Sequence, residues 1–324
     1  MDEVLGLEDY LSKRVRRLAC LASSDRAFAV SAEYLQEFCG IRVSAETLRL
    51  QCERQGQHMA AWQPQSSSVA EQFAQAVGEL EFQMDAGKAN TLQGWRDLKL
   101  AAFVKRPLGE PATLSQWDSR ELPAPTARTM FAAIESIDAF QTRLRPQAVR
   151  LGIGDPATIH ALGDGAEWIW NAVDSNFPRC RQTLDIYHGN ENVAKACKGL
   201  YGEGTAEAKA SFERGRGELL AKGWTGICNH VAAELAVADT PERRQVLEDM
   251  TQYFAKHVGR LQYQQHLAEG RTIGSGLVEG SVKTVGLRIK ARGARWCVGN
   301  VDKIAGLCCL RHSTSWADYW HSTN

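Results

Sequence analysis

Three acidic residues occupy positions from which their carboxylates could act together. Asp85 and Asp164 each directly follow an apolar run with the pattern of a β-strand, and Glu279 falls in the first turn of an expected helix behind Gly274-Ser275-Gly276. Acids at adjacent strand ends can converge, and a packed helix can add a third, although like charges repel unless cations compensate. Mg²⁺ takes oxygen ligands, and two such ions about 4 Å apart stabilise both oxygens of an in-line phosphoryl displacement. The pattern therefore favours metal-dependent phosphodiester chemistry.

Each of these residues also has a simpler interpretation. An Asp after a strand is commonly a turn residue, and Glu279 could pair with Lys283 at i, i+4. Asp185 and His188 could ligate a metal, but two ligands do not make a zinc site, and a hydrogen-bonded core histidine is the alternative. Ser275 lies between two glycines, yet Gly-Ser-Gly without a preceding strand lacks the pattern of a serine hydrolase.

A run of basic residues follows the last of these acids, Glu279, in the sequence. Residues 281–296 contain no acid and five bases, namely Lys283, Arg288, Lys290, Arg292 and Arg295. Arg288, Arg292 and Arg295 would share one face if the helix continued that far. A basic helix face is usually only solvated, but beside metal-binding acids it is consistent with a track for a phosphate backbone.

The elements that must position these residues alternate between strand and helix. The predicted strands are residues 80–85, 95–104, 158–162 and 182–188. The predicted helices of the same region and of the C-terminal part are residues 128–145, 166–176, 277–292 and 302–324. Residues 191–265 have helical patterns and no strand signal, which indicates an inserted helical domain. Strand, helix and strand with acids at the strand ends predict an α/β sheet.

The N-terminal region is expected to be helical. A helix from Val30 to Phe38 ends at Gly40, and Ser44 caps a second helix from Ala45 to Arg54. This is the outline of a DNA-binding helix-turn-helix, and the alternative is a helical subdomain that serves packing only. Residues 63–71 are polar and predict a linker.

Composition excludes several classes of protein. The chain has 324 residues with 44% apolar and 23% charged side chains, which is typical of a globular protein and not of a fully disordered one. It has no apolar run of about 18 residues for a membrane span, no expected signal peptide and nine cysteines without a CxxC pair, so we expect a reducing cytoplasm. Its 38 basic and 38 acidic residues cancel, which argues against a nucleic-acid partner until the local basic run is considered.

Three ordered stretches resemble the DDE transposases of the ISKra type, bacterial insertion-sequence enzymes related to the Mutator-like superfamily. They are GDGAEWIW (163–170), LDIYHGNENV (184–193) with LYGEG (200–204), and IGSGLVEGSVKTVGLRIKARGARW (273–296). The resemblance implies an α+β fold with a ribonuclease H-like mixed-sheet core and an all-helical insertion before the final Glu. We therefore expect an N-terminal region at 1–62, a core in two parts at 75–190 and 269–324, and an insertion at 191–268.

The same resemblance implies the site and its activity. The catalytic, metal-binding triad would be Asp85, Asp164 and Glu279, with Asp185 and His188 in support and Asp185 as a rival for the second acid. Two Mg²⁺ ions, which Mn²⁺ can replace, would serve cleavage and strand transfer at insertion-sequence ends.

The implied partners are double-stranded DNA, as element ends and as target, and further copies of the chain in a homodimer or larger synaptic complex. No membrane partner is expected, and the site of action would be the bacterial cytoplasm, at the nucleoid when DNA is bound. Lys283, Arg288, Lys290, Arg292 and Arg295 would bind DNA, and Trp168, Trp170 or Trp296 could stack on flipped bases, with core packing as the alternative. The competing hypotheses are a catalytically inactive, repurposed DNA-binding protein and a nuclease of the same fold that does not join strands.

Overall fold

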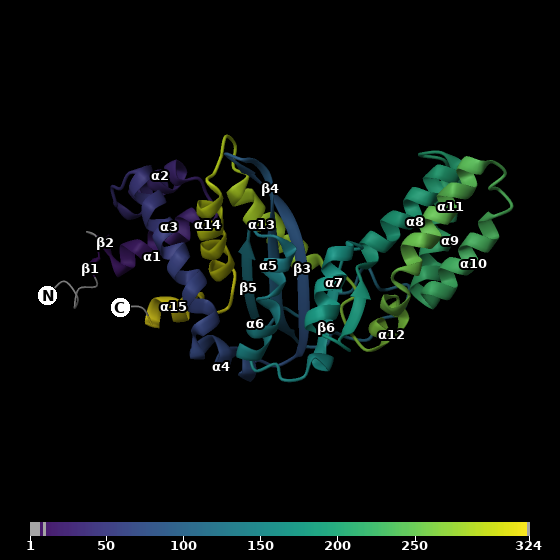
Figure 1. The fold of residues 1–324 in the computed structure, drawn as a ribbon, viewed down its shortest axis with the longest axis horizontal. Coiled ribbons are helices and arrows are strands. Elements are labelled where there is room, and N and C mark those ends of the chain that lie inside the picture. The colour runs from purple at the N-terminus through teal and green to yellow at the C-terminus, as the bar shows by residue number, and fades with distance from the viewer. Residues whose placement is uncertain (1–6, 9–10, 323–324) are drawn as a thin grey trace. The chain divides into compact units, whose positions relative to one another are not determined.

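The structure is a computed structural model that describes residues 7–8 and 11–322. The chain forms two compact units, each built from segments that are separated in the sequence (Figure 1). The first unit comprises residues 1–105, 125–156 and 276–324, and the second comprises residues 106–124 and 157–275.

The first unit combines a long β-hairpin with helices from both ends of the chain. Its strands are β1 (Leu7–Glu8), β2 (Leu11–Ser12), β3 (Glu79–Thr91), β4 (Gly94–Arg106) and β5 (Ala127–Ala133). Its helices are α1 (Lys13–Ser23), α2 (Phe28–Cys39), α3 (Ala45–Trp62), η1 (Gln63–Gln65), α4 (Ser67–Gln75), α5 (Ile137–Gln141), α6 (Leu144–Arg150), α13 (Gly276–Ile289), α14 (Val298–Arg311) and α15 (Trp316–Ser322).

The core of this unit lies between the strands and the C-terminal helices. Alternate residues of β4, including Leu98 and Leu100, pack against Val285 of α13 and Ile304 of α14. Helices α14 and α3 approach so closely that a Cβ on Gly56 would lie 1.9 Å from the carbonyl oxygen of Lys303. Only glycine fits there, so the N-terminal helices are firmly packed onto α14.

The second unit contains a pair of parallel strands and a set of helices. Its strands are β6 (Ile159–Gly163) and β7 (Arg181–Leu184). Its helices are α7 (Glu167–Asn176), α8 (Ile186–Tyr201), α9 (Ala206–Lys222), α10 (Trp224–Glu234), α11 (Pro241–Ala255), η3 (Val258–Arg260) and α12 (Tyr263–Ala268), and the short helix η2 (Pro156–Thr158) leads into it.

One mixed sheet carries the strands that follow the N-terminal helices, in the order β5-β4-β3-β6-β7. β4 and β5 are antiparallel, whereas β6 and β7 are parallel. The prediction of a mixed α/β chain is therefore confirmed. Residues 191–268 contain no strand, as predicted, whereas the domain boundaries proposed from the sequence stay a prediction.

Several predicted elements are wrong. The strand predicted to end at Asp85 continues as β3 to Thr91, and the predicted linker at 63–71 is largely helical in η1 and α4. The predicted helix at 128–145 is instead the strand β5 followed by two short helices. The reason is that β5 pairs with β4 along its whole length, with Ala133 opposite Lys99 and Ala127 opposite Lys105. This long-range pairing overrides the local helical spacing of the apolar residues.

In the described part of the chain, no helix is long and apolar enough to cross a membrane.

Candidate metal centre

Asp185 accepts hydrogen bonds at both of its carboxylate oxygens. It follows β7 directly and caps the N-terminus of α8, where its Oδ1 accepts hydrogen bonds from the backbone N–H groups of Tyr187 (2.7 Å) and His188 (3.0 Å). Its Oδ2 accepts hydrogen bonds from the backbone N–H and the hydroxyl of Ser275, the latter at 2.9 Å. The predicted strand through His188 is therefore wrong, because β7 ends at Leu184 and Asp185 begins a helix.

His188 lies against the same carboxylate. Its Nδ1 is 3.3 Å from Asp185 Oδ1, and this contact raises the pKa of His188 to about 9 against the opposing effect of burial. The charges of Asp164 and Glu191 act in the same direction. Burial opposes ionisation of Asp185, but hydrogen bonds from His188 and Ser275 outweigh it and hold the pKa of Asp185 below its usual value. At neutral pH the pair is an imidazolium against a carboxylate.

Asp164 and Asp185 occupy matching positions on neighbouring strands. β6 and β7 pair in parallel with Gly163 opposite Leu184, so the residues that follow them leave the same edge of the sheet side by side. Asp164 is half-buried, and its Oδ1 accepts a hydrogen bond from the backbone N–H of Ala166 at 2.8 Å. The prediction that Asp164 directly follows its strand is confirmed, whereas Asp185 was predicted inside a strand and instead follows the end of β7.

A groove of 650 Å³ begins one residue after Asp164. Its lining includes Gly165, Trp170, Tyr253, His257 and Arg260. A Cβ on Gly165 would lie 2.3 Å from the Tyr253 hydroxyl oxygen, so glycine is required for this approach. Burial, with the charges of Asp164 and Asp185, raises the pKa of Tyr253, which stays protonated.

Asp85 lies in the middle of β3, on the face that α13 covers. Alternation along the strand places Gln83, Asp85 and Gly87 on one side. Gln83 accepts a hydrogen bond from the backbone N–H of Val278 (3.1 Å), and a Cβ on Gly87 would lie 3.0 Å from Val282. Asp85 therefore lies beneath the first two turns of α13, the helix that carries the third predicted acid.

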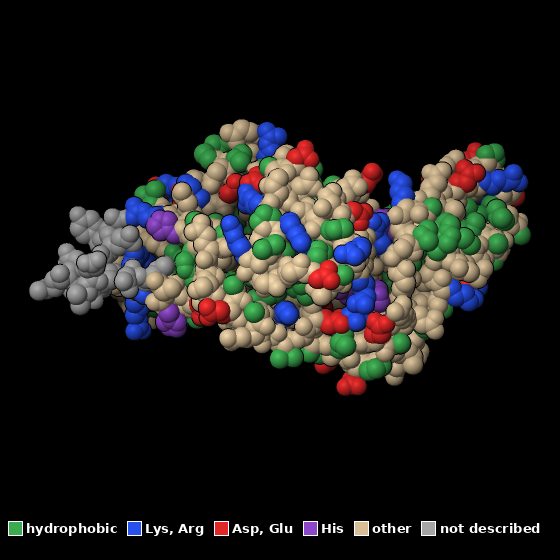
Figure 2. Space-filling model, turned by 60° about the horizontal axis from the view of Figure 1, so that its bottom comes forward, with side chains coloured by type: hydrophobic (Ala, Val, Ile, Leu, Met, Phe, Trp, Pro, Cys, Tyr) green, Lys and Arg blue, Asp and Glu red, His purple; other side chains and the backbone are tan. Residues whose placement is uncertain are grey.

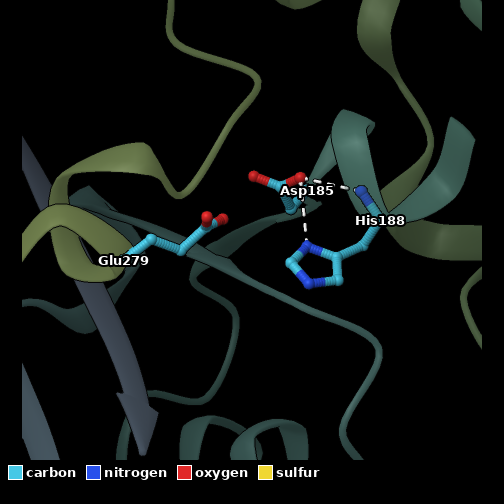
Figure 3. Close-up of side chains that lie close together, drawn as sticks. All are labelled: Asp185, His188 and Glu279. Atoms are coloured by element: carbon cyan, nitrogen blue, oxygen red, sulfur yellow. Dashed lines mark hydrogen bonds and ion pairs between the residues drawn. The ribbon is translucent and has the colours of Figure 1, made fainter. Parts of the chain in front are cut away.

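Glu279 is half-buried in the first turn of α13. Its Oε2 is 3.8 Å from Lys283 Nζ, so the i, i+4 pair considered from the sequence is present. Candidate ligand atoms of Asp185, His188 and Glu279 lie within 4.8 Å of one another, and the three form a group that could hold a metal ion (Figure 3). Asp85 and Asp164 are not members of this group.

Asp185 and Asp164 differ in how far hydrogen bonds already occupy their carboxylate oxygens. A carboxylate offers about four lone-pair sites, and the donors from α8 and Ser275 already occupy those of Asp185, whose side chain is fully buried. A metal bound there would displace these bonds. Asp164 accepts a single backbone hydrogen bond and is partly exposed.

The predicted basic face of the last core helix does not form. α13 ends at Ile289, where the Trp296 indole N–H donates to the Ile289 carbonyl at 2.8 Å. Arg288 is only 2% exposed: its Nε donates to the Ser23 carbonyl (2.6 Å), and its guanidinium lies 4.4 Å from the ring centroid of Phe28. Arg288 is therefore corrected from a DNA-binding residue to a packing residue.

The other four predicted DNA-binding side chains are exposed. They are Lys283 on α13 and Lys290, Arg292 and Arg295 on the loop that follows it. On the face drawn in Figure 2, Lys and Arg side chains are interspersed with Asp and Glu. A broad positive field is absent from that face, so any DNA affinity there has to come from local groups.

Two of the three tryptophans considered for base stacking are buried. The guanidinium of Arg260 lies 4.2 Å from the ring centroid of Trp170, and that of Arg288 lies 5.2 Å from the ring centroid of Trp296. Both indoles are therefore core residues, in agreement with the alternative interpretation. Sequence reasoning overlooked the exposed Trp95, although its position at the start of the strand predicted for residues 95–104 was a usable signal. It also considered Ser275 only as a nucleophile and missed its role as a donor to Asp185.

Comparison with family models and with curated proteins finds no match for this chain.

Proposed function

We propose that the protein is a DDE-type transposase with a ribonuclease H-like core, which cleaves and joins DNA strands with the help of divalent metal ions. The observation that carries the proposal is the arrangement at the carboxyl ends of β6 and β7, where Asp164 and Asp185 emerge side by side and His188 lies against Asp185. A mixed five-stranded sheet and a strand-free stretch before the Glu-bearing helix agree with the fold that the sequence resemblance implies.

Under this proposal the acids divide their roles. Asp85, Asp164 and Glu279 would hold two Mg²⁺ ions, which would supply activation of water and of a 3′-OH. Asp185 is a positioning residue, because its hydrogen bonds fix His188 and the segment that leads from Ser275 into α13. The positive charge of His188 beside Asp164 offsets part of the repulsion among the acids.

The proposed substrates are the insertion-sequence ends and a target duplex, bound by at least two copies of the chain. A nuclease without strand transfer and a repurposed DNA-binding protein remain the rivals. The nuclease shares every metal-binding residue with the transposase, so only the products separate the two. The repurposed protein would bind DNA without cutting it.

The test incubates the whole protein with labelled duplexes that carry the sequences flanking its coding region, together with an unlabelled target plasmid. Reactions contain Mg²⁺, Mn²⁺ or EDTA. We expect nicked ends and joined products with either metal and neither product with EDTA. Nicking alone would favour the nuclease, and binding without nicking would favour the repurposed protein.

A pair of matched variants locates the chemistry. Asp164→Asn should abolish nicking and joining while leaving DNA binding intact, because it removes a metal-binding charge without touching the bonds of Asp185. Asp239→Asn is the control, since Asp239 is an exposed acid whose ion pair, among the described residues, is with Arg243. Unchanged cleavage by Asp164→Asn would overturn the assignment of the second acid.

A further inference from the structure

The loop between α13 and α14 is bound to the tip of the β3–β4 hairpin. The backbone N–H of Leu92 donates to the Trp296 carbonyl (2.8 Å), and the Trp296 N–H donates to the Asn90 carbonyl (3.1 Å). The Asn90 side chain donates to the Ala294 carbonyl at 3.3 Å. Figure 1 shows this yellow loop beside the end of the blue hairpin. We call residues 91–96 and 290–297 together the hairpin–loop tip.

Two large apolar side chains are exposed at this tip. Leu92, within the tight turn, is 51% exposed, and Trp95, just after the turn, is 61% exposed. The turn is well defined, since the Thr91 hydroxyl donates to the Gly94 carbonyl at 2.6 Å and Gly94 has a φ of +93°. A tryptophan held in water on a rigid hairpin leaves a large apolar surface for a partner.

Strand alternation places a cation on the same side as this tryptophan. Leu98 and Trp296 both belong to the core of the first unit. Trp95 lies three residues before Leu98, and Arg295 lies directly before Trp296, which bridges Thr91 in parallel. Because neighbouring residues of extended backbone point to opposite faces, Trp95 and Arg295 share the face that points away from the core.

The charge of the tip has a single sign. Its exposed bases are Arg96, Lys290, Arg292 and Arg295, and neither segment contains an acid. Within the described residues these four side chains have no ion-pair partner, whereas Lys88, further down the hairpin, pairs with Asp97 at 2.6 Å. The tip is therefore a local cationic site with an apolar centre, in a chain whose net charge is zero.

From this juxtaposition we propose that the hairpin–loop tip is a wedge that binds duplex DNA. The identity of the partner rests on the proposed function. Leu92 and Trp95 enter between base pairs, while Arg292 and Arg295 contact the phosphates. Apolar wedges of this kind kink DNA by about 20–90°, and the cost of unstacking is offset by the added contact. The unpaired cations favour a polyanion, and the flat indole matches the faces of bases.

The first test measures binding and bending together. A duplex of about 30 base pairs carries a donor and an acceptor dye at its ends, and the whole protein is added in EDTA so that no cleavage occurs. We expect Trp95→Ala to weaken binding about tenfold and to abolish the change in energy transfer. Trp95→Phe should retain most of both. Leu287→Ala is the matched control, because Leu287 is 77% exposed on α13 and lies outside the tip.

The second test uses salt to separate the cations from the wedge. Loss of a phosphate contact lowers the slope of log K against log salt by about 0.9. Arg292→Ala and Arg295→Ala should each reduce the slope by about this amount, whereas Trp95→Ala should leave it unchanged. Arg150→Ala, an exposed arginine of α6 in the same unit, should also leave it unchanged.

The outcomes separate this inference from the proposed function. If Trp95→Ala binds and bends DNA as the parent protein does, the wedge is wrong even when the parent cleaves DNA. If the parent protein ignores the duplex but binds phosphatidylserine vesicles, the wedge is also wrong and the tip is a membrane contact. If the parent bends DNA through Trp95 but never cleaves it with Mg²⁺ or Mn²⁺, the wedge stands and the transposase proposal fails.

Discussion

Two histidine sites lie at the β6–β7 pair, and their pKa values are shifted in opposite directions. Within the strands, His160 Nε2 contacts the Thr183 hydroxyl at 2.7 Å, and Nδ1 of His266, on α12, contacts the same hydroxyl at 2.9 Å. Burial lowers the pKa of His160 far below its usual value and that of His266 to about 4. Beyond the strands' carboxyl ends, contact with Asp185 instead raises the pKa of His188 to about 9.

The difference lies in the counter-charge. The first site has a hydroxyl between two buried rings, and a neutral imidazole is the form that such an enclosure favours. The second site has an acid in contact and two more acids close enough to act on it, while the His188 side chain remains one-third exposed. We infer that the first site serves stability and that the second retains charge for chemistry.

The largest expected effect is a difference in stability between variants of Asp185 and Asp164, the two acids at the strand ends. Asp185→Asn should lower the free energy of unfolding by about 3 kcal/mol, because it removes a buried charge that accepts several hydrogen bonds. Asp164→Asn should change stability by less than about 1 kcal/mol, since Asp164 accepts one backbone bond. Urea unfolding of the two variants measures this, and equal losses would contradict the division between positioning and metal-binding acid.

Acid should destabilise the protein through the buried histidines. A lowered folded-state pKa means that the unfolded chain binds more protons, so this stability is present above about pH 6.5 and is lost as the pH falls toward 4. For His266 the full effect is about 3 kcal/mol. His266→Gln should flatten the fall in stability across this window relative to the parent protein. Parallel curves for the two proteins would show that His266 is not held neutral.

Local patterns were sufficient to predict Asp164 at the end of its strand. An apolar run followed by Gly163-Asp164-Gly165 predicts a strand and its end, and β6 spans Ile159–Gly163. Gly40 likewise ends α2 as predicted, in the left-handed conformation that glycine adopts readily. These features depend on neighbouring residues only, which is why sequence alone predicts them.

Long-range contacts explain what the sequence did not predict. The pattern of Met130 and Ile134 fits a helix, but pairing with β4 makes this segment a strand. The basic pattern around Arg288 fits a solvated face, but Phe28, far away in the chain, covers its guanidinium. Similarly, the donors from Ser275 that saturate Asp185 come from ninety residues away, so the choice between Asp164 and Asp185 could not be made from spacing.

A smaller effect is expected from the hydroxyl that links the two buried histidines. Thr183→Val keeps the shape of the side chain but leaves the nitrogens of His160 and His266 without their partner. Loss of these bonds should cost about 1–2 kcal/mol in unfolding free energy at pH 7.5. Thr142→Val is the control, since Thr142 is exposed and, among the described residues, its hydroxyl donates to the Ala139 carbonyl of the preceding helix. An equal loss in the control would mean that the histidine network adds nothing.

The smallest loss of stability should come from substitution of Ser275. The same variant tests whether Ser275 has a chemical role. Ser275→Ala removes the hydroxyl bond to Asp185 but keeps the backbone N–H that donates to the same oxygen. Because the carboxylate retains its donors from α8, we expect a loss of about 1 kcal/mol in unfolding free energy and metal-dependent cleavage that stays within a few-fold of the parent. A serine nucleophile between Gly274 and Gly276 would instead make the variant inactive without destabilising it. Unfolding and cleavage measured on the same preparation therefore decide between a positioning donor and a reacting group.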